Sequence, residues 1–360
     1  MSTEVAARME ALVIAGPNQY AVETVDVGSP GPGEVLCKVH AVSICGTDSH
    51  LLRGDYPGFW PPSYPFTSGH EWAGEVVEVG GGTEGFGLSV GTRVAGTSHA
   101  ACGYCARCVE GRYNVCENYG NPRLHRHYGH NWTGALAQYV VHNIKAVFPL
   151  PDELDYAEGA LLDPASIALH TANRGNVGAG DVVLILGAGP IGLLAADASL
   201  VLGASRVVVA APGPATHGRL GKAVELGHET LDTSVDDVPA AVRQMTGGRG
   251  ADVVLDCAGV PESLTTAIAS LRRGGRCVVV GIPVRPAAVD LQKLVLDEMD
   301  LVGVRGSAGE MRSVIPLVRD GRIRVKPLIT HHFPLREFAE AVTVFDERRD
   351  GAVKVVIHPW

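Results

Sequence analysis

The stretch that decides the fold is residues 181–192, DVVLILGAGPIG. It begins as an apolar run typical of a buried strand. Three glycines follow at the spacing GxGxxG: Gly187, Gly189 and Gly192. At a strand–helix junction, the first glycine permits a tight turn, the second lets a pyrophosphate approach the backbone, and the third lets helix and strand pack closely. A glycine-rich turn that binds nothing is the alternative. We expect a dinucleotide site, with Pro190 and Ile191 opening a helix whose N–H groups face the phosphate.

Working outward, strand-like and helix-like patterns alternate from about residue 163 to residue 306. Strand-like segments such as RVVVAA and ADVVLDCAG are separated by helix-like segments such as GRLGKAVELG and ESLTTAIASLRRG. This alternation predicts a doubly wound parallel sheet of the Rossmann type, covered on both faces. Earlier runs such as GEVLCKVHAVSIC and EWAGEVVEVG predict a mainly β region. The expected fold class is α/β, with one domain at 1–165 and 307–360 and a dinucleotide-binding domain at 166–306.

Composition narrows the class of protein. The 360 residues are 46% hydrophobic and 19% charged, with a formal net charge of -9. Lysine and arginine form no cluster, so neither nucleic acid nor an anionic membrane is an expected partner. The N-terminal residues show no secretory pattern, and the apolar run at 182–196 is too short to span a membrane. We expect a cytoplasmic protein, whose eight cysteines are metal ligands or core residues rather than disulfides.

The strand after the glycine motif bears on the choice of cofactor. An acidic residue there usually binds the adenosine ribose of NAD. Here the expected position falls near Ala210 and Ala211, and no acidic residue follows until Glu225. Arg219 lies in the same loop and could pair with a 2′-phosphate. The pattern favours NADP over NAD; the alternative is that Arg219 only begins the next helix and NAD binds without its usual anchor.

The segment CGYCARCVEGRYNVC places four cysteines in one short loop: Cys102, Cys105, Cys108 and Cys116. Four thiolates at this spacing suit a tetrahedral structural zinc. An iron–sulfur cluster uses a similar start, but its fourth cysteine comes sooner and precedes proline, whereas here the last cysteine precedes Glu117. Disulfides are disfavoured by the expected compartment. Because cysteine fills all four positions, this zinc would be closed to substrate.

Two further segments carry candidate polar residues upstream of the cysteine loop. SICGTDSH contains Cys45, Thr47, Asp48 and His50, and SGHEWAGEVVEVG contains His70 and Glu71. Each segment alone is weak evidence for a metal site, since a single cysteine is most often a small core residue. With VSICGTDSH, GHEWAGEVVEVG, the cysteine loop and LILGAGPIG in this order, the chain resembles the zinc-dependent medium-chain alcohol dehydrogenase family along almost its full length. GHEWAGEV, YGHNWTGALAQYV and LLDPASIALH are most similar to its sorbitol and threonine dehydrogenase group.

The resemblance implies a GroES-like catalytic domain, to which the C-terminal tail returns, and two zinc ions per chain. It also implies that Cys45 and His70 hold the catalytic zinc and that the third ligand comes from the segment of Asp163. Glu71 is the rival third ligand. Asp163 followed by Pro164 also predicts a helix N-cap, and the two roles of Asp163 are compatible.

The implied activity is reversible oxidation of a secondary alcohol, polyol or cyclitol by hydride transfer to a nicotinamide cofactor. Thr47 and His50 match the family's proton relay, and Asp48 is expected to support His70 from behind. Lys354 matches a cation that faces the coenzyme pyrophosphate. A homodimer or homotetramer is expected. The alternatives are a non-catalytic, zinc-stabilised dinucleotide-binding protein and a zinc-free enzyme of the quinone reductase branch.

Two groups of residues have no settled role from sequence. Phe59, Trp60 and Trp132 fall in segments that line the family's substrate pocket, although a role in the core is the simpler interpretation. PRLHRHYGHNW contains three histidines, which we expect in a solvated loop: His125, His127 and His130.

Overall fold

The structure is a computed structural model that describes residues 5–214 and 216–360, folded into two compact units. The first unit is the chain up to Asp163 together with Met311–Arg319 and Val325–Trp360. The second unit is Pro164–Glu310 together with Asp320–Arg324. The sequence suggested boundaries near residues 165 and 307 and did not indicate that Asp320–Arg324 belongs to the second unit.

The second unit contains a six-stranded parallel sheet. Its spatial order is β12 (Glu229–Asp232), β11 (Arg206–Ala211), β10 (Val182–Leu186), β13 (Ala251–Asp256), β14 (Leu271–Val279) and β15 (Asp300–Gly303). The chain starts in the middle of the sheet at β10, extends to one edge, and then returns to extend to the other. This is the doubly wound Rossmann order, so the predicted fold class is confirmed.

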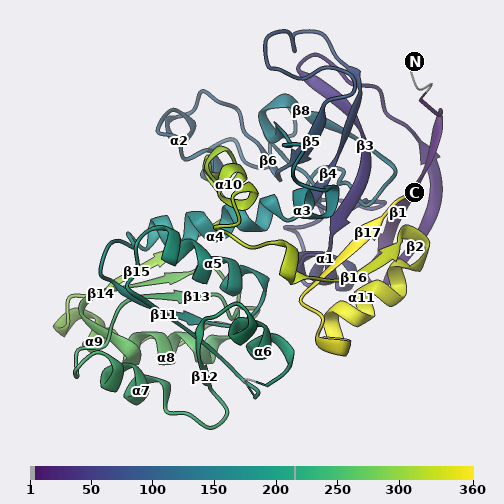
Figure 1. Ribbon diagram of the computed structural model, residues 1–360. Coiled ribbons are helices and arrows are strands. Elements are labelled where there is room, and N and C mark those ends of the chain that lie inside the picture. Colours follow the sequence, from purple (N-terminus) through teal and green to yellow (C-terminus); the bar gives the residue numbers. More distant parts are fainter. Residues whose placement is uncertain (1–4, 215) are drawn as a thin grey trace. The chain divides into compact units, whose positions relative to one another are not determined.

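Helices pack on both sides of this sheet (Figure 1). They are α5 (Pro190–Val201), α6 (Gly218–Glu225), α7 (Val238–Met245), α8 (Pro261–Ser270) and α9 (Leu291–Leu296), with α4 (Leu162–Arg174) beginning at the end of the first unit. Proline stands in the first turn of α5, α7 and α8, where its missing N–H has no helical partner to lose. The side chain of Asp237 caps α7 by accepting from the Ala240 N–H.

A buried ion pair explains why Asp320–Arg324 joins the second unit. Asp197, on α5, is 2% exposed. Arg324 donates to Asp197 Oδ2 through its backbone N–H at 2.9 Å and its Nε at 3.0 Å. His228 Nε2 lies 3.0 Å from Asp197 Oδ1. The partners are 127 residues apart in sequence, so no local pattern could indicate this contact.

The first unit is built on a seven-stranded sheet. Its path is β16 (Ile329–Pro334), β17 (Lys354–His358), β3 (Glu34–Ser43), β4 (Glu71–Val79), β5 (Arg93–Gly96) and β9 (Val147–Pro149), with β8 (Tyr139–Asn143) also paired to β3. Smaller sheets join β1 (Arg8–Gly16) to β2 (Gln19–Asp26) and β6 (His99–Ala100) to β7 (Arg126–His127). Strand β17 pairs with β3, so the C-terminal tail returns to the first unit as the resemblance implied.

Short helices complete the first unit. They are α1 (Gly46–Arg53), α2 (Ala106–Val109), α3 (Tyr156–Ala160), α11 (Phe338–Glu347) and α10 (Glu310–Arg319), which starts at the last residue of the second unit's main segment. Its core contains Val35, Trp72 and Phe338, all nearly inaccessible to solvent. Across residues 5–214 and 216–360, no helix has the length and apolar character needed to cross a membrane.

Candidate active site and metal centres

Cys45 is presented at the start of α1, directly after strand β3 ends. Its backbone is extended (φ -102°, ψ 153°), and it is the N-cap residue of the helix. Asp48 Oδ2 accepts from the Cys45 N–H at 2.9 Å, which closes the first turn. The side chain of Asp48 is fully buried, and burial raises its pKa. The backbone therefore fixes the position of the thiol, whose sulfur lies beside Thr47 and His70.

Strand pairing brings His70 and Glu71 beside Cys45. Glu71 opens β4 and pairs with Ser43 at the end of β3. Gly69 precedes them at φ +94°, where an added Cβ would meet the Leu136 nitrogen at 2.7 Å, so only glycine fits. The Gly69 N–H donates to Asp48 Oδ1 at 3.1 Å. Asp48 thus bridges the two segments that carry the ligand candidates.

The ligand atoms of Cys45, His70 and Glu71 all lie within 4.8 Å of one another. Thiolate, imidazole and carboxylate are the donors that zinc uses in catalytic sites with three protein ligands. Burial alone would lower the pKa of His70, but the negative charges of Cys45, Asp48 and Glu71 outweigh it and raise that pKa to about 10. A pocket that attracts positive charge this strongly fits a divalent cation.

Glu71 is held by two donors at one of its oxygens. Ser43 Oγ and Lys354 Nζ both donate to Glu71 Oε2, which leaves Oε1 for another partner. Lys354 Nζ also donates to the Ile44 carbonyl at 3.0 Å. Lys354 is 2% exposed, and its ammonium group is directed into the first unit. This placement does not fit the expected role of Lys354 at the coenzyme pyrophosphate, nor that of a solvated strand-end lysine.

Asp163 is not part of this ligand group. It is 1% exposed, and its Oδ1 accepts from Thr97 Oγ1 at 2.6 Å. Burial raises the pKa of Asp163 to about 6. Helix α4 begins at Leu162, so Asp163 lies in its first turn and is not the expected N-cap. The geometry favours the rival, Glu71, over Asp163 as third ligand, because pairing of β3 with β4 brings Glu71 to Cys45.

The two relay candidates both lie on α1. Thr47 Oγ1 is 3.8 Å from Cys45 Sγ, at the metal end of the helix. His50, one turn later, has a 29% exposed side chain, and its Nδ1 lies 2.7 Å from Asp55 Oδ2. The hydrogen bond from His50 lowers the pKa of Asp55. Helix α1 thus carries one polar group beside the ligands and another that reaches solvent.

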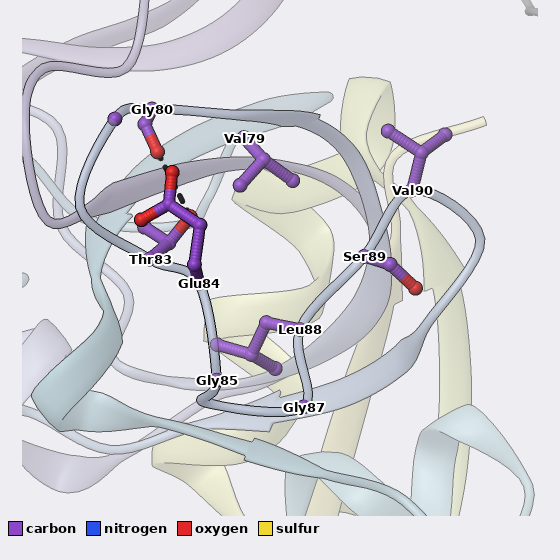
Figure 2. A pocket seen from close by; sticks show the side chains of 10 residues that line it. Val79, Gly80, Thr83, Glu84, Gly85, Gly87, Leu88, Ser89 and Val90 are labelled. Atoms are coloured by element: carbon purple, nitrogen blue, oxygen red, sulfur yellow. Dashed lines mark hydrogen bonds between the residues drawn. The ribbon is translucent and has the colours of Figure 1, made fainter.

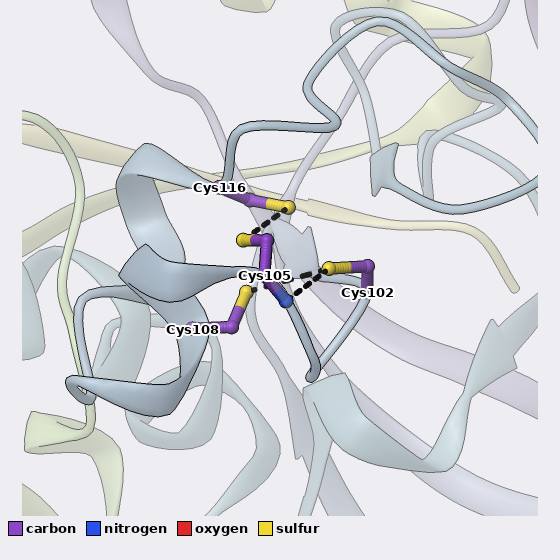
Figure 3. Close-up of side chains that lie close together, drawn as sticks. All are labelled: Cys102, Cys105, Cys108 and Cys116. Carbon is purple, nitrogen blue, oxygen red and sulfur yellow. Dashed lines mark hydrogen bonds between the residues drawn. The ribbon is translucent and has the colours of Figure 1, made fainter.

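The four cysteines of the lobe converge as predicted (Figure 3). The Sγ atoms of Cys102 and Cys108 are 3.8 Å apart, and those of Cys105 and Cys116 are 3.9 Å apart. Four sulfurs at about 2.3 Å from a tetrahedral zinc would be separated by about 3.8 Å. A disulfide needs about 2.05 Å. The observed spacing fits the all-cysteine zinc and contradicts the disulfide alternative.

N–H groups favour the thiolate form at Cys102 and Cys105, whereas burial raises the pKa of Cys108 and Cys116. Burial would raise the pKa of Cys102, but backbone N–H groups of Tyr104 and Cys105 and the Asn118 side chain lower it to about 6. Asn118 Nδ2 lies 3.3 Å from Cys102 Sγ, and the Glu117 N–H lies 3.4 Å from Cys105 Sγ. Thiolate is the form that binds zinc, so these N–H groups prepare Cys102 and Cys105 for the metal.

In the second unit, the glycine motif has the geometry that a pyrophosphate requires. Gly187 follows β10 at φ +101°, and Gly189 caps α5. A Cβ at Gly192 would lie 1.9 Å from the Gly187 carbonyl oxygen, so no larger residue fits there. A Cβ at Gly189 would lie 3.7 Å from Arg219 Nη1. Arg219 therefore stands at the phosphate-binding turn, while Ala211 ends β11 without an acidic group.

The histidines of PRLHRHYGHNW are not solvated, which corrects the expectation. His125, His127 and His130 are 1%, 4% and 5% exposed. The His130 ring centroid lies 4.4 Å from that of His70. Their sequence signal was the density of imidazoles in one segment, which does not distinguish a surface loop from a buried cluster.

A hollow of about 770 Å³ lies at the loop between β4 and β5 (Figure 2). Its walls come from residues 79–90, where Thr83 Oγ1 donates to the Gly80 carbonyl at 2.8 Å. None of the ligand, relay or glycine-motif residues lines it, so this hollow is separate from the chemistry.

Comparisons with known proteins agree with this geometry. Residues 31–152 match the alcohol dehydrogenase GroES-like domain, and residues 190–320 match the zinc-binding dehydrogenase domain. Sorbitol dehydrogenase of Bacillus subtilis (strain 168) is 32% identical over 100% of this chain and 99% of its own length. A zinc-binding dehydrogenase from Sinorhizobium meliloti 1021, solved with NADP, is 31% identical with a TM-score of 0.88, covering 98% of this chain and 100% of that one. The 2R,3R-butanediol dehydrogenase of Bacillus subtilis is 31% identical with a TM-score of 0.86, at the same coverage.

A Rossmann unit, a GroES-like unit and two groups of zinc ligands together define a zinc-dependent dehydrogenase. The chain belongs to the zinc-dependent medium-chain alcohol dehydrogenase family. It is an oxidoreductase that oxidises an alcohol with zinc and a nicotinamide cofactor. The two alternatives, a non-catalytic binding protein and a zinc-free quinone reductase, do not account for these matches or for both ligand groups.

Proposed function

We propose that this dehydrogenase oxidises a secondary hydroxyl of a polyol or vicinal diol. Sorbitol and 2,3-butanediol, in the names of two relatives, both carry a secondary hydroxyl next to another hydroxyl. The observation that carries the proposal is the group formed by Cys45, His70 and Glu71. Three protein ligands leave a fourth position for the substrate hydroxyl.

Glu71, rather than Asp163, is the third ligand in this proposal. Ser43 and Lys354 hold Glu71 Oε2, so Oε1 would be the oxygen that holds the metal, while Lys354 offsets the carboxylate charge. Asp163 instead accepts a hydrogen bond from Thr97, beside the ligand group. Asp48 Oδ1 lies 4.0 Å from His70 Nδ1 and favours the ring orientation that leaves Nε2 for the metal.

Bound zinc supplies a Lewis acid that makes the substrate hydroxyl more acidic, and the nicotinamide ring accepts the hydride. Residues of the chain itself carry the proton of the substrate hydroxyl to solvent. Thr47 Oγ1, next to Cys45, would accept a hydrogen bond from the substrate hydroxyl and release its own proton as it takes the substrate's. His50 is partly exposed and paired with Asp55, which suits it to pass a proton to water. Both therefore act as proton carriers on α1.

The cofactor preferred in this proposal is NADP. Arg219 stands at the glycine turn, and β11 ends at Ala211 without an acidic side chain of its own, so a 2′-phosphate would meet a cation there. Asp232, at the end of the neighbouring strand β12, accepts from the Gly213 N–H at 2.9 Å. Arg219→Ala should lower kcat/KM with NADP about tenfold, the loss of one charged hydrogen bond, and leave the value with NAD nearly unchanged. A wild-type enzyme that favours NAD would refute this preference.

The proposed assembly is a homodimer or homotetramer in the cytoplasm. Strand β15 is the last strand of its sheet, and strand edges carry unpaired backbone groups. Exposed apolar side chains lie on or near it: Leu291, Val295, Leu296 and Leu301. A second copy of this unit would cover them, and Leu296→Glu should then shift the mass measured by light scattering towards the monomer.

The eight cysteines form no disulfide, which suits a reducing compartment such as the cytoplasm.

The experiment that tests the proposed function is a panel of alcohols assayed for formation of reduced cofactor. It should contain primary alcohols, isolated secondary alcohols, vicinal diols, sugar alcohols and cyclitols, each with NAD and with NADP. We expect the highest kcat/KM for a vicinal diol or polyol. A clear preference for primary alcohols would refute the proposed substrate class.

A further inference from the structure

Three buried imidazoles, His130, His127 and His99, form a stack behind the proposed ligand His70, and a fourth, His125, contacts its far end. The ring of His130 packs on that of His70, with centroids 4.4 Å apart. His127 stacks on His130 at 3.7 Å and an interplanar angle of 6°, and His99 stacks on His127 at 4.1 Å and 10°. His99 Nδ1 lies 3.3 Å from His125 Nε2 at the far end. The metal-binding role described above uses none of these four rings.

Hydrogen bonds clamp the middle of the stack. Trp60 Nε1, which can only donate, lies 2.6 Å from Tyr119 Oη. Tyr119 Oη lies 2.9 Å from His127 Nδ1, so its own hydrogen is available to that nitrogen. The Trp60 ring also meets His130 edge-on, with centroids 4.7 Å apart. His130 Nδ1 is 3.1 Å from the Tyr128 carbonyl. The His127 and His130 rings are therefore fixed in position and rotation.

Tyr119, which makes these hydrogen bonds, is attached to the four-cysteine lobe. Tyr119 follows Cys116 by three residues, and its N–H donates to the Cys116 carbonyl at 3.1 Å. The adjacent Asn118 donates to Cys102 Sγ at 3.3 Å. Because zinc binding orders such loops, the position of Tyr119 depends on the folded lobe.

His70 needs such support because its second nitrogen has a weak anchor. A histidine that binds zinc usually donates its other N–H to a nearby acceptor, which fixes the ring. Among the residues that the structure describes, His70 Nδ1 has no hydrogen-bond partner, and Asp48 Oδ1 is 4.0 Å away. Ring packing by His130 is what restricts the rotation of His70 in place of a short hydrogen bond.

We propose that Tyr119, His127 and His130 are positioning residues that hold His70 in its metal-binding orientation and connect it to the four-cysteine lobe. The proposal rests on His70 being a ligand of the catalytic zinc. Groups that orient a metal-binding histidine typically change metal affinity by about 10- to 100-fold. Loss of the His130 ring should weaken the catalytic site by this amount and leave the lobe's own affinity unchanged.

The experiment measures zinc affinity in the full-length holoenzyme by chelator competition at fixed pH, counting zinc ions per chain. For His130→Ala, we expect the Kd of the catalytic zinc to rise at least tenfold while the lobe zinc is retained. His130→Phe restores a flat ring against His70 and should recover most of the affinity. Tyr119→Phe removes only the hydroxyl and should raise the same Kd by a smaller factor.

His142→Gln is the matched control. His142 is a buried imidazole of the same unit, stacked on Tyr128 at 3.6 Å. Its loss should leave the catalytic Kd unchanged. With cobalt in the catalytic site, His130→Ala should shift the visible absorption spectrum, which a general loss of stability would not do.

Three results would overturn the proposal. They are an unchanged catalytic Kd in His130→Ala, failure of His130→Phe to recover affinity, and an equal loss in His142→Gln. Retention of two zinc ions in His70→Ala would show that His70 is not a zinc ligand, which is the premise of the proposal. The zinc measurements involve no alcohol, so failure of the proposed substrate class would leave their outcome unchanged.

Discussion

Replacement of Lys354 by methionine tests the ion pair that holds Glu71. Both side chains are almost fully buried, at 2% and 1% exposure. Methionine keeps most of the volume of lysine but cannot neutralise the carboxylate or donate to the Ile44 carbonyl, now 3.0 Å from Nζ. The substitution therefore leaves a buried charge without its cation while changing the packing little.

The expected cost follows from this burial. Removing one partner of a buried ion pair typically destabilises a protein by about 3–5 kcal/mol, because the remaining charge is left uncompensated. We expect a loss in this range for Lys354→Met in metal-depleted protein. In zinc-loaded protein the loss should be smaller, because the metal takes over the compensation of Glu71. The double variant Lys354→Met/Glu71→Gln should recover most of the stability, since no charge remains to be compensated.

Tryptophan fluorescence during urea unfolding is the assay, because it reports on the first unit alone. The protein has four tryptophans, and all of them lie in this unit: Trp60, Trp72, Trp132 and Trp360. The reasoning is refuted if Lys354→Met loses less than about 1 kcal/mol without metal, well below the range for a broken buried pair. It is equally refuted if the double variant is no more stable than Lys354→Met.

Two further predictions use the same unit. Glu71→Gln should reduce the zinc content from two ions per chain to one, whereas Asp163→Asn should retain both; the reverse pattern, measured by elemental analysis, would make Asp163 the ligand. Burial lowers the pKa of His142 to about 3, so His142 stays neutral in the folded protein while an unfolded histidine takes up a proton below about pH 6.5. Stability should therefore fall as pH drops from about 6.5 towards 3, by up to about 1.4 kcal/mol per pH unit from this residue. His142→Gln should make the urea midpoint less dependent on pH in this range, and an unchanged dependence would contradict the prediction.

Features encoded by local spacing could be predicted from sequence. The glycine motif works through neighbouring backbone atoms, as the 1.9 Å approach between a Gly192 Cβ and the Gly187 carbonyl shows. The cysteine lobe likewise brings Cys102 to Cys116 together within one short segment. Both were identified because sequence separation and spatial separation nearly coincide.

Contacts between distant strands could not be predicted in the same way. Lys354 and Glu71 are 283 residues apart and meet only because β17 pairs with β3 and β3 pairs with β4. The register of β3 against β4 shifts twice, between Leu36 and Cys37 and between Val39 and Ala41. Such irregularities decide which residue faces the ligand group, and they leave no pattern in the sequence. This is why Glu71 and Asp163 could not be separated by sequence reasoning.

The order of segments along the chain determines when each part of the metal site is synthesised. Cys45, His70 and Glu71 all leave the ribosome before the second unit is made, whereas Lys354, the cation that balances Glu71, belongs to β17, which is synthesised after it. During translation the nascent first unit must carry an unbalanced carboxylate while most of the second unit is already able to fold, since domains generally fold as units. An early zinc ion would relieve that charge before Lys354 arrives, so metal supply during synthesis should govern the yield of native enzyme.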